Sequence, residues 1–174
     1  MQNAQALVHE CQDCRVSVAR RGDQLKVVAS EDISMGQTIL TVEGVETTVP
    51  SVYSVQISET SHIDLDDPSL VDQFPERYLW RFLNHHCQPN AALQGRVLVA
   101  IHHIHAGDEV TFNYNSNEYD MASPFECWCD AHGRSAAREV RGYRYLSETE
   151  RSRLAPYAAA HVKVLAEREG LGDP

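Results

Sequence analysis

Residues 81–90 read RFLNHHCQPN, and residues 104–114, which follow after a short turn, read IHAGDEVTFNY. These two segments hold the densest gathering of Asn, His, Cys and Tyr side chains in the chain. The second contains the turn signal Ala-Gly-Asp at 106–108, and the strand pattern at 109–113 follows it. Any chemistry that this protein performs is therefore expected at these two segments.

The two segments closely resemble the two C-terminal motifs of SET-domain protein methyltransferases, which read roughly R-F-x-N-H-S-C-x-P-N and G-E-E-L-T-F-D-Y. Six distinctive positions of the first motif match in order. Residues 25–36 resemble the opening motif of the family, and residues 53–57 and 62–64 resemble its middle strands. The resemblance runs from about Leu25 to Tyr145.

This resemblance implies a fold, namely a mainly β, SET-domain β-clip-like fold with short helices. In that fold the segment around Asn84 is threaded by the C-terminal segment as a pseudoknot. The expected division is an N-terminal extension at 1–24, a SET core at 25–120, a post-SET-like segment at 121–146 and a helical tail at 147–174.

The residues themselves favour the same mixture of short strands and helices. Val, Ile and Thr runs bounded by turn signals predict five strands, at 25–29, 38–43, 53–58, 96–101 and 109–113. Pro75 predicts the first turn of a helix through Leu83. Ser147 and Glu150 predict a capping box that opens a helix over 148–154, and a second, docked helix is expected from Pro156 to Glu169.

The resemblance also implies two catalytic tyrosines. Tyr114 matches the tyrosine at the reactive centre of the family, whose hydroxyl would hold the amine in line, and Tyr53 matches a channel wall. Methyl transfer from a sulfonium needs an aligned amine that has lost its proton, in a site that excludes water. A lysine is mostly charged at neutral pH, so the site must help to deprotonate it.

S-adenosylmethionine is the cofactor that the resemblance implies. Asn84 and His85 match the pair that binds this methyl donor, and Phe125 or Trp128 would stack on its adenine. Two glycines of the opening motif, which let the backbone approach the donor, are replaced here by Gln24 and Lys26. Lys26 therefore either restricts the donor site or points away from it.

Zinc is the second group that the resemblance suggests. Cys87, Cys127 and Cys129 match three of the four post-SET cysteines, and His132 could supply the missing ligand, as could Cys11 or Cys14. A site that has lost its metal is the alternative. A second histidine cluster, His102, His103 and His105, is expected to splay its side chains and to hold no metal.

Charge and composition indicate the class of partner. The chain carries 15 Lys and Arg against 25 Asp and Glu, a net charge of −10, which disfavours nucleic acid and anionic membranes and favours basic proteins or amines. The start of the chain lacks a signal-peptide pattern, so a cytoplasmic protein is expected. Its five cysteines are then expected to be free thiols or metal ligands.

The leading interpretation is a small SET-type N-methyltransferase with a degenerate post-SET cysteine segment that acts on an amine, with protein lysine first. A small-molecule amine substrate is one alternative. Two others are a catalytically degenerate SET-like module for binding or regulation, and a SET-fold enzyme that uses the donor for other chemistry.

Overall fold

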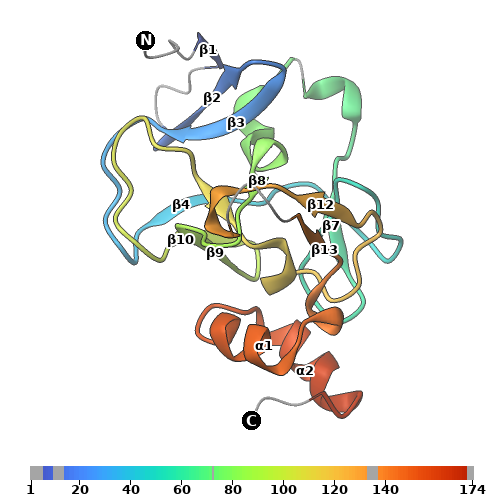
Figure 1. Ribbon diagram of the computed structural model, residues 1–174. Helices are drawn as coiled ribbons and strands as arrows, with labels where there is room; N and C mark the ends of the chain where they lie inside the picture. The colour runs from blue at the N-terminus through green and yellow to red at the C-terminus, as the bar shows by residue number, and fades with distance from the viewer. Residues whose placement is uncertain (1–5, 10–13, 72, 133–136, 172–174) are drawn as a thin grey trace.

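A computed structural model describes residues 6–9, 14–71, 73–132 and 137–171 (Figure 1). Small sheets form the main body, and two α-helices near the C-terminus pack below it in the view of Figure 1. The mainly β architecture with short helices confirms the predicted fold class. None of the helices in the described part is long and apolar enough to span a membrane.

Three small antiparallel sheets make up most of the body. The first has the order β1-β2-β3, the second β4-β10-β9 and the third β5-β7-β6. Their strands are β1 (Ala6–His9), β2 (Val16–Arg21), β3 (Gln24–Ala29), β4 (Thr38–Thr41), β5 (Val45–Thr47), β6 (Val55–Gln56), β7 (His62–Asp64), β9 (Ala91–Gln94) and β10 (Val97–Ala100). One core of Val, Ile, Leu and aromatic side chains joins these sheets, with Val16, Val27, Ile63 and Leu98 fully buried.

The two motif segments lie side by side in the centre of the molecule. Strand β8 (Asn84–His85) pairs in parallel with β11 (Thr111–Phe112), with Thr111 opposite Asn84 and Phe112 opposite His85. The backbone N–H of His86 extends this ladder by donating to the Phe112 carbonyl over 3.1 Å. The two motif segments are therefore in direct backbone contact.

Three of the five predicted strands are present with similar bounds, whereas those predicted at 53–58 and 109–113 are reduced to the two-residue strands β6 and β11. Tyr53 lies in a bend before β6, where its backbone N–H donates to the Ser51 hydroxyl over 3.2 Å. This serine-based turn satisfies the backbone locally, so the strand begins only at Val55.

The helix predicted at 75–83 forms at the expected place, but it is a 3-10 helix rather than an α-helix. It is η2 (Pro75–Phe82), opened by Pro75 and interrupted at Tyr78, whose φ and ψ are −116° and 24°. Tyr78 is fully buried and hydrogen-bonded to Asp66, which also pairs with Arg77. Anchoring of Tyr78 from outside the helix, rather than local periodicity, therefore determines its winding.

Both predicted tail helices are present and docked. The capping box of Ser147 and Glu150 opens α1 (Glu148–Leu154) as predicted. Helix α2 (Ala160–Arg168) begins four residues after the predicted start at Pro156, because Ala159 is extended and its N–H donates to the Ser116 carbonyl over 2.8 Å.

A second, smaller core fixes this tail to the body, with Tyr119, Tyr143 and Val162 among its buried members. Gly142 allows the backbone before η5 to pack closely against the backbone of Tyr119. Its φ is 118°, its N–H donates to the Asn115 side chain, and a Cβ there would lie 2.5 Å from the Tyr119 carbonyl oxygen. A side chain at residue 142 would therefore push the tail away from the site.

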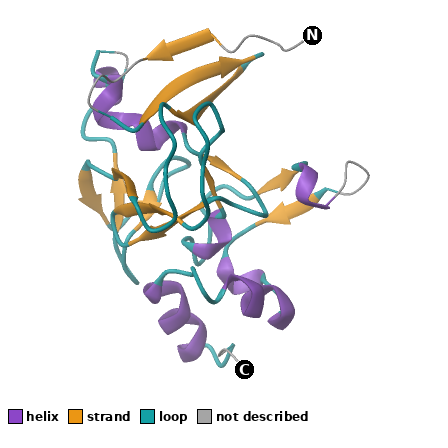
Figure 2. Cartoon of the chain, turned by 90° about the vertical axis from the view of Figure 1, so that its left-hand side faces the viewer, coloured by secondary structure: helices purple, strands orange, loops and turns teal. Residues whose placement is uncertain are grey.

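The remaining elements are short. One precedes the first motif, and the other five begin at or after Tyr114. They are η1 (Pro68–Leu70), η3 (Tyr114–Ser116), β12 (Phe125–Cys127), η4 (Asp130–His132), β13 (Arg138–Val140) and η5 (Tyr143–Tyr145). Strands β12 and β13 form an antiparallel hairpin that extends from the side of the body, with η4 next to it (Figure 2).

Cys14 is disulfide-bonded, so the expectation of thiols or metal ligands is wrong at this residue, whereas Cys87, Cys127 and Cys129 are free. Cys11 lies outside the described residues.

Candidate active site and metal centre

Tyr114 stands where β11 ends and η3 begins, next to the first motif segment. Its hydroxyl donates to the Leu83 carbonyl over 2.6 Å, and its backbone N–H donates to His85 Nδ1 over 3.1 Å. Burial, together with the nearby charges of Glu118 and Glu109, raises the pKa of Tyr114. The hydroxyl is therefore neutral at physiological pH and is a positioning group rather than a base.

An aromatic cluster surrounds Tyr114. The centroid of its ring lies 4.8 Å from that of Phe112, 5.3 Å from that of His85 and 5.9 Å from that of Phe125. Such packing holds the ring in one orientation.

Tyr53 and Tyr114 line one pocket of about 80 Å³, so the structure brings the two predicted catalytic tyrosines together. The Arg81 guanidinium stacks on the Tyr53 ring, 3.1 Å from its centroid. Arg81 also lines this pocket, and its Nε is buried with no hydrogen-bond partner among the described residues.

Glu118 also lines this pocket, and the sequence reasoning missed it. Its carboxylate accepts from the Gln56 N–H over 2.8 Å and from Asn117 Nδ2 over 3.3 Å, and its side chain is 13% exposed. Burial raises the pKa of Glu118 from 4.5 to about 7, against the effect of these hydrogen bonds. The pocket therefore holds a carboxyl group that changes charge near neutral pH.

His62 is the titratable group that faces Glu118 from β7, with its Nε2 3.9 Å from the carboxylate. Burial and the neighbouring His161 lower the pKa of His62. His62 is therefore neutral at pH 7 and leaves the Glu118 charge uncompensated.

His85 links the reactive tyrosine to the cysteines. Its Nδ1 accepts from the Tyr114 N–H, so its Nε2 carries the proton and faces Cys87 Sγ at 3.3 Å. Burial, with smaller effects of His86 and His132, lowers the pKa of His85 to about 4. The imidazole is neutral and fixed in one tautomer.

Asn84 and Lys26 meet at a shared carboxylate. Asn84 Nδ2 donates to the Leu25 carbonyl over 3.1 Å and to Glu109 Oε1 over 2.9 Å, while the Lys26 ammonium lies 3.6 Å from Glu109 Oε2. The Lys26 side chain is only 5% exposed. The structure thus brings Lys26 and Asn84 together and leaves Lys26 turned inward.

The two aromatic residues predicted to bind adenine lie on or beside the β12–β13 hairpin. Phe125 is 36% exposed, and the centroid of its ring lies 5.7 Å from that of His85. Trp128 is 59% exposed, just beyond the end of β12. Both residues therefore expose aromatic surface, and Phe125 does so beside His85.

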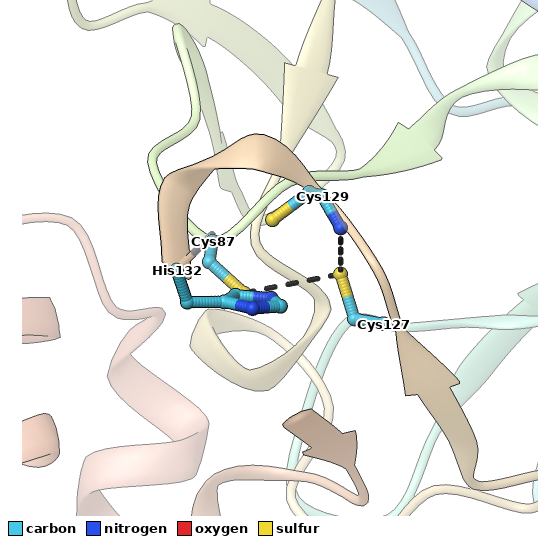
Figure 3. Close-up of side chains that lie close together, drawn as sticks. All are labelled: Cys87, Cys127, Cys129 and His132. Atoms are coloured by element: carbon cyan, nitrogen blue, oxygen red, sulfur yellow. Dashed lines mark hydrogen bonds between the residues drawn. The ribbon is translucent and has the colours of Figure 1, made fainter. Parts of the chain in front are cut away.

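Cys87, Cys127, Cys129 and His132 converge on one point, as Figure 3 shows. Their ligand atoms all lie within 4.8 Å of one another, and the Sγ atoms of Cys87 and Cys127 are 4.0 Å apart. Tetrahedral zinc with Zn–S bonds of about 2.3 Å separates two sulfurs by about 3.8 Å. Both ring nitrogens of His132 are buried without a hydrogen-bond partner among the described residues, so this donor set fits a Cys₃His zinc centre.

Burial and close contact between the sulfurs set the protonation of the cysteine cluster. Burial and the neighbouring sulfurs raise the pKa of Cys87, and burial likewise raises that of Cys127. For Cys129 burial acts in the same direction, but hydrogen bonds from the backbone of Cys87 and Ala131 outweigh it and lower the pKa. A bound divalent cation would stabilise all three thiolates together.

His86 stands where the family motif has serine, and it fastens the first motif to the hairpin. Its Nε2 lies 2.9 Å from Asp130 Oδ1. Burial alone would lower the pKa of His86, but the hydrogen bonds to Asp130 and to the Gln88 carbonyl raise it. This contact holds η4, and with it His132, beside Cys87.

The expectation that the second histidine cluster splays apart is wrong for two of its three members. The ring centroids of His103 and His105 are 4.5 Å apart, and both rings face Asp32. The backbone here is strand-like, since Ile104 pairs with Ile33, and residues two apart in a strand share a face.

Comparison with known proteins identifies the class to which this fold and site belong. The family model of the SET domain matches residues 24–115, more than half of the chain. The chain belongs to the SET domain family.

Two relatives are histone-lysine N-methyltransferases described as H3 lysine-36 specific. The one from Emericella nidulans is 36% identical over 75 aligned positions, which cover 38% of this chain and 8% of the relative. The one from Yarrowia lipolytica is 28% identical over 129 positions, which cover 66% of this chain and 16% of the relative. The chain thus matches only a small part of the length of either.

Proposed function

We propose that this protein is an S-adenosylmethionine-dependent N-methyltransferase whose substrate is a lysine amine of a basic protein. The observation that carries the proposal is the position of the Tyr114 hydroxyl. It is held by the Leu83 carbonyl between the His85–Phe125 side of the molecule and the pocket of Tyr53 and Glu118. Membership of the SET family and the two lysine methyltransferase relatives support the same activity.

S-adenosylmethionine, when bound, supplies an electrophilic methyl group to an amine. Asn84 and His85 would hold it, with Phe125 or Trp128 against the adenine. The chain's own residues have three tasks: Tyr114 orients the amine, the aromatic walls exclude water, and Glu118 attracts the cationic side chain into the pocket. The net charge of −10 favours approach of a basic substrate.

Zinc, in this proposal, holds the donor-side hairpin in place. Cys127 ends β12, Cys129 and His132 follow it, and Cys87 belongs to the first motif. A metal bound by all four would tie Phe125 and Trp128 to the segment that carries Asn84 and His85.

The first test is binding of S-adenosylmethionine by calorimetry, followed by methyl transfer to histones and to free lysine. We expect donor binding and transfer to histones that exceeds transfer to free lysine. Binding without transfer to any amine would favour a regulatory SET-like module. Absence of binding in zinc-loaded protein would refute the methyltransferase assignment, and the buried Lys26 in place of a glycine would then explain the loss.

Replacement of Glu118 by Gln should weaken substrate binding without abolishing donor binding. A hydrogen bond to a charged group is worth about 1.5–3 kcal/mol, so we expect a roughly 10- to 100-fold rise in KM for the lysine substrate. The kcat/KM of the wild type should rise as the pH passes about 7 and the carboxyl ionises. That step should be missing from the pH profile of the variant.

Glu167→Gln, the same change at an exposed position of α2, is the matched control and should leave KM unchanged.

The stability of the Glu118→Gln variant gives an independent test of the role of Glu118. The pKa of Glu118 is raised in the folded state, so its contribution to stability is full below about pH 4.5 and is lost as the pH rises through about 7. The difference in melting temperature between wild type and Glu118→Gln should therefore change across this range. A pH-independent difference, together with an unaltered KM, would remove Glu118 from the proposal.

A further inference from the structure

We propose that Asp32, His103 and His105 form a second metal site, separate from the cysteine cluster, that binds a divalent transition ion such as Zn²⁺. Their ligand atoms all lie within 4.8 Å of one another. His103 Nε2 is 3.9 Å from Asp32 Oδ2, and His105 Nδ1 is 3.9 Å from Asp32 Oδ1.

Backbone pairing between two segments of the chain brings these three side chains together. Ile33 and Ile104 exchange two backbone hydrogen bonds, of 2.8 and 2.9 Å, and both side chains are buried. Residues on either side of an inward-facing strand residue point outward together, so His103 and His105 share the outer face. Asp32 adjoins Ile33 on the opposite strand and lies on the same face. The two connecting segments run side by side at the left of Figure 1.

Further hydrogen bonds orient the ligands. The Ala106 N–H donates to Asp32 Oδ1 over 2.9 Å, and the His105 N–H donates to Asp108 Oδ2 over 3.1 Å. Partners of this kind fix ligand geometry in metal sites. Zinc ligands at about 2.1 Å in a tetrahedral arrangement lie about 3.4 Å apart, so these exposed side chains need only rotate inward by a small amount.

The donor atoms select the class of ion. Two imidazoles and one carboxylate suit zinc and its neighbours, whereas calcium and magnesium prefer oxygen ligands throughout. Three protein ligands leave at least one position for water or for a group from outside the chain. A bound ion would fasten the segment after β3 to the segment before β11.

Zinc content tests this inference independently of the methyltransferase proposal. The full chain, its His103→Ala/His105→Ala variant and the His102→Ala control are dialysed against the same micromolar Zn²⁺ and analysed for metal. His102 is exposed and adjacent but is not part of the cluster. The cysteine cluster is present in all three proteins, so its contribution cancels in the comparison.

We expect the double variant to hold one zinc equivalent fewer than the wild type, and the His102→Ala control to match the wild type. Asp32→Asn should weaken this site by at least about tenfold, the loss that follows removal of even an outer-shell partner. Equal zinc content in wild type and double variant, or the same loss in the His102→Ala control, would overturn the assignment.

Discussion

Tyr114→Phe should lower kcat for methyl transfer by about 10²- to 10³-fold, the size of effect seen when one preorganised hydrogen-bonding group is removed from an active site. The hydroxyl donates to the Leu83 carbonyl and lies in the pocket with Tyr53 and Glu118. Without it, the ring remains packed against His85 and Phe125, but the group that orients the amine is gone. Donor affinity should therefore stay close to that of the wild type.

Tyr119→Phe is the matched control for this experiment. Tyr119 also donates its hydroxyl to a backbone carbonyl, that of Leu165 at 3.3 Å, but it does so in the core of the tail. Each variant should lose about 1 kcal/mol of stability, as expected for one hydrogen bond, and only Tyr114→Phe should lose activity. An equal fall in activity for both variants would mean that the effect is structural, and unchanged activity in Tyr114→Phe would exclude the assigned role.

His132→Ala should abolish tight zinc binding at the cysteine cluster, and with it donor binding. Structural zinc sites contribute about 10–16 kcal/mol of binding free energy in small peptides, so the loss of one of four ligands has a large effect. The hairpin that carries Phe125 and Trp128 would lose its tie to Cys87. The prediction is checked by cobalt substitution, because the sulfur-to-cobalt charge-transfer bands report on this cluster and not on a site of histidine and aspartate.

His132→Cys provides the matching rescue. A thiolate in place of the imidazole gives the Cys₄ set, so this variant should bind cobalt with a stronger sulfur charge-transfer band and should regain donor binding. If His132→Ala keeps the wild-type spectrum, His132 is not a ligand. If His132→Cys fails to restore metal binding, the geometry of the cluster does not suit a tetrahedral ion.

The parts of the site that could be predicted are those in which a short motif determines backbone pairing. The resemblance of the motifs around Asn84 and Tyr114 to the SET family implied the fold in which β8 and β11 pair, and the match to the post-SET cysteines implied three ligands of one centre. The capping box at Ser147 was predictable because its two hydrogen bonds involve residues three apart.

Other features depend on contacts that no local pattern reveals. Glu118 reaches the pocket because the chain turns helically after Tyr114, with the Glu118 N–H donating to the Tyr114 carbonyl over 2.8 Å. Glu118 lies four residues after Tyr114 in the sequence. This spacing predicts that both side chains reach one pocket only if the intervening residues are known to form a helical turn. The winding of η2 likewise depends on Tyr78 and Asp66, and the face shared by His103 and His105 depends on the distant Ile33.

The pairing of β8 with β11 also has a dynamic consequence. A fluctuation that separates the two strands removes the hydrogen bond from the Tyr114 N–H to His85 and the one from the His86 N–H to Phe112 together. We therefore expect these two hydrogen bonds to break and re-form together. A ligand bound on the donor side or in the substrate pocket should slow amide hydrogen exchange at both Tyr114 and His86. Binding of the donor should therefore strengthen binding of the substrate, and binding of the substrate should strengthen that of the donor.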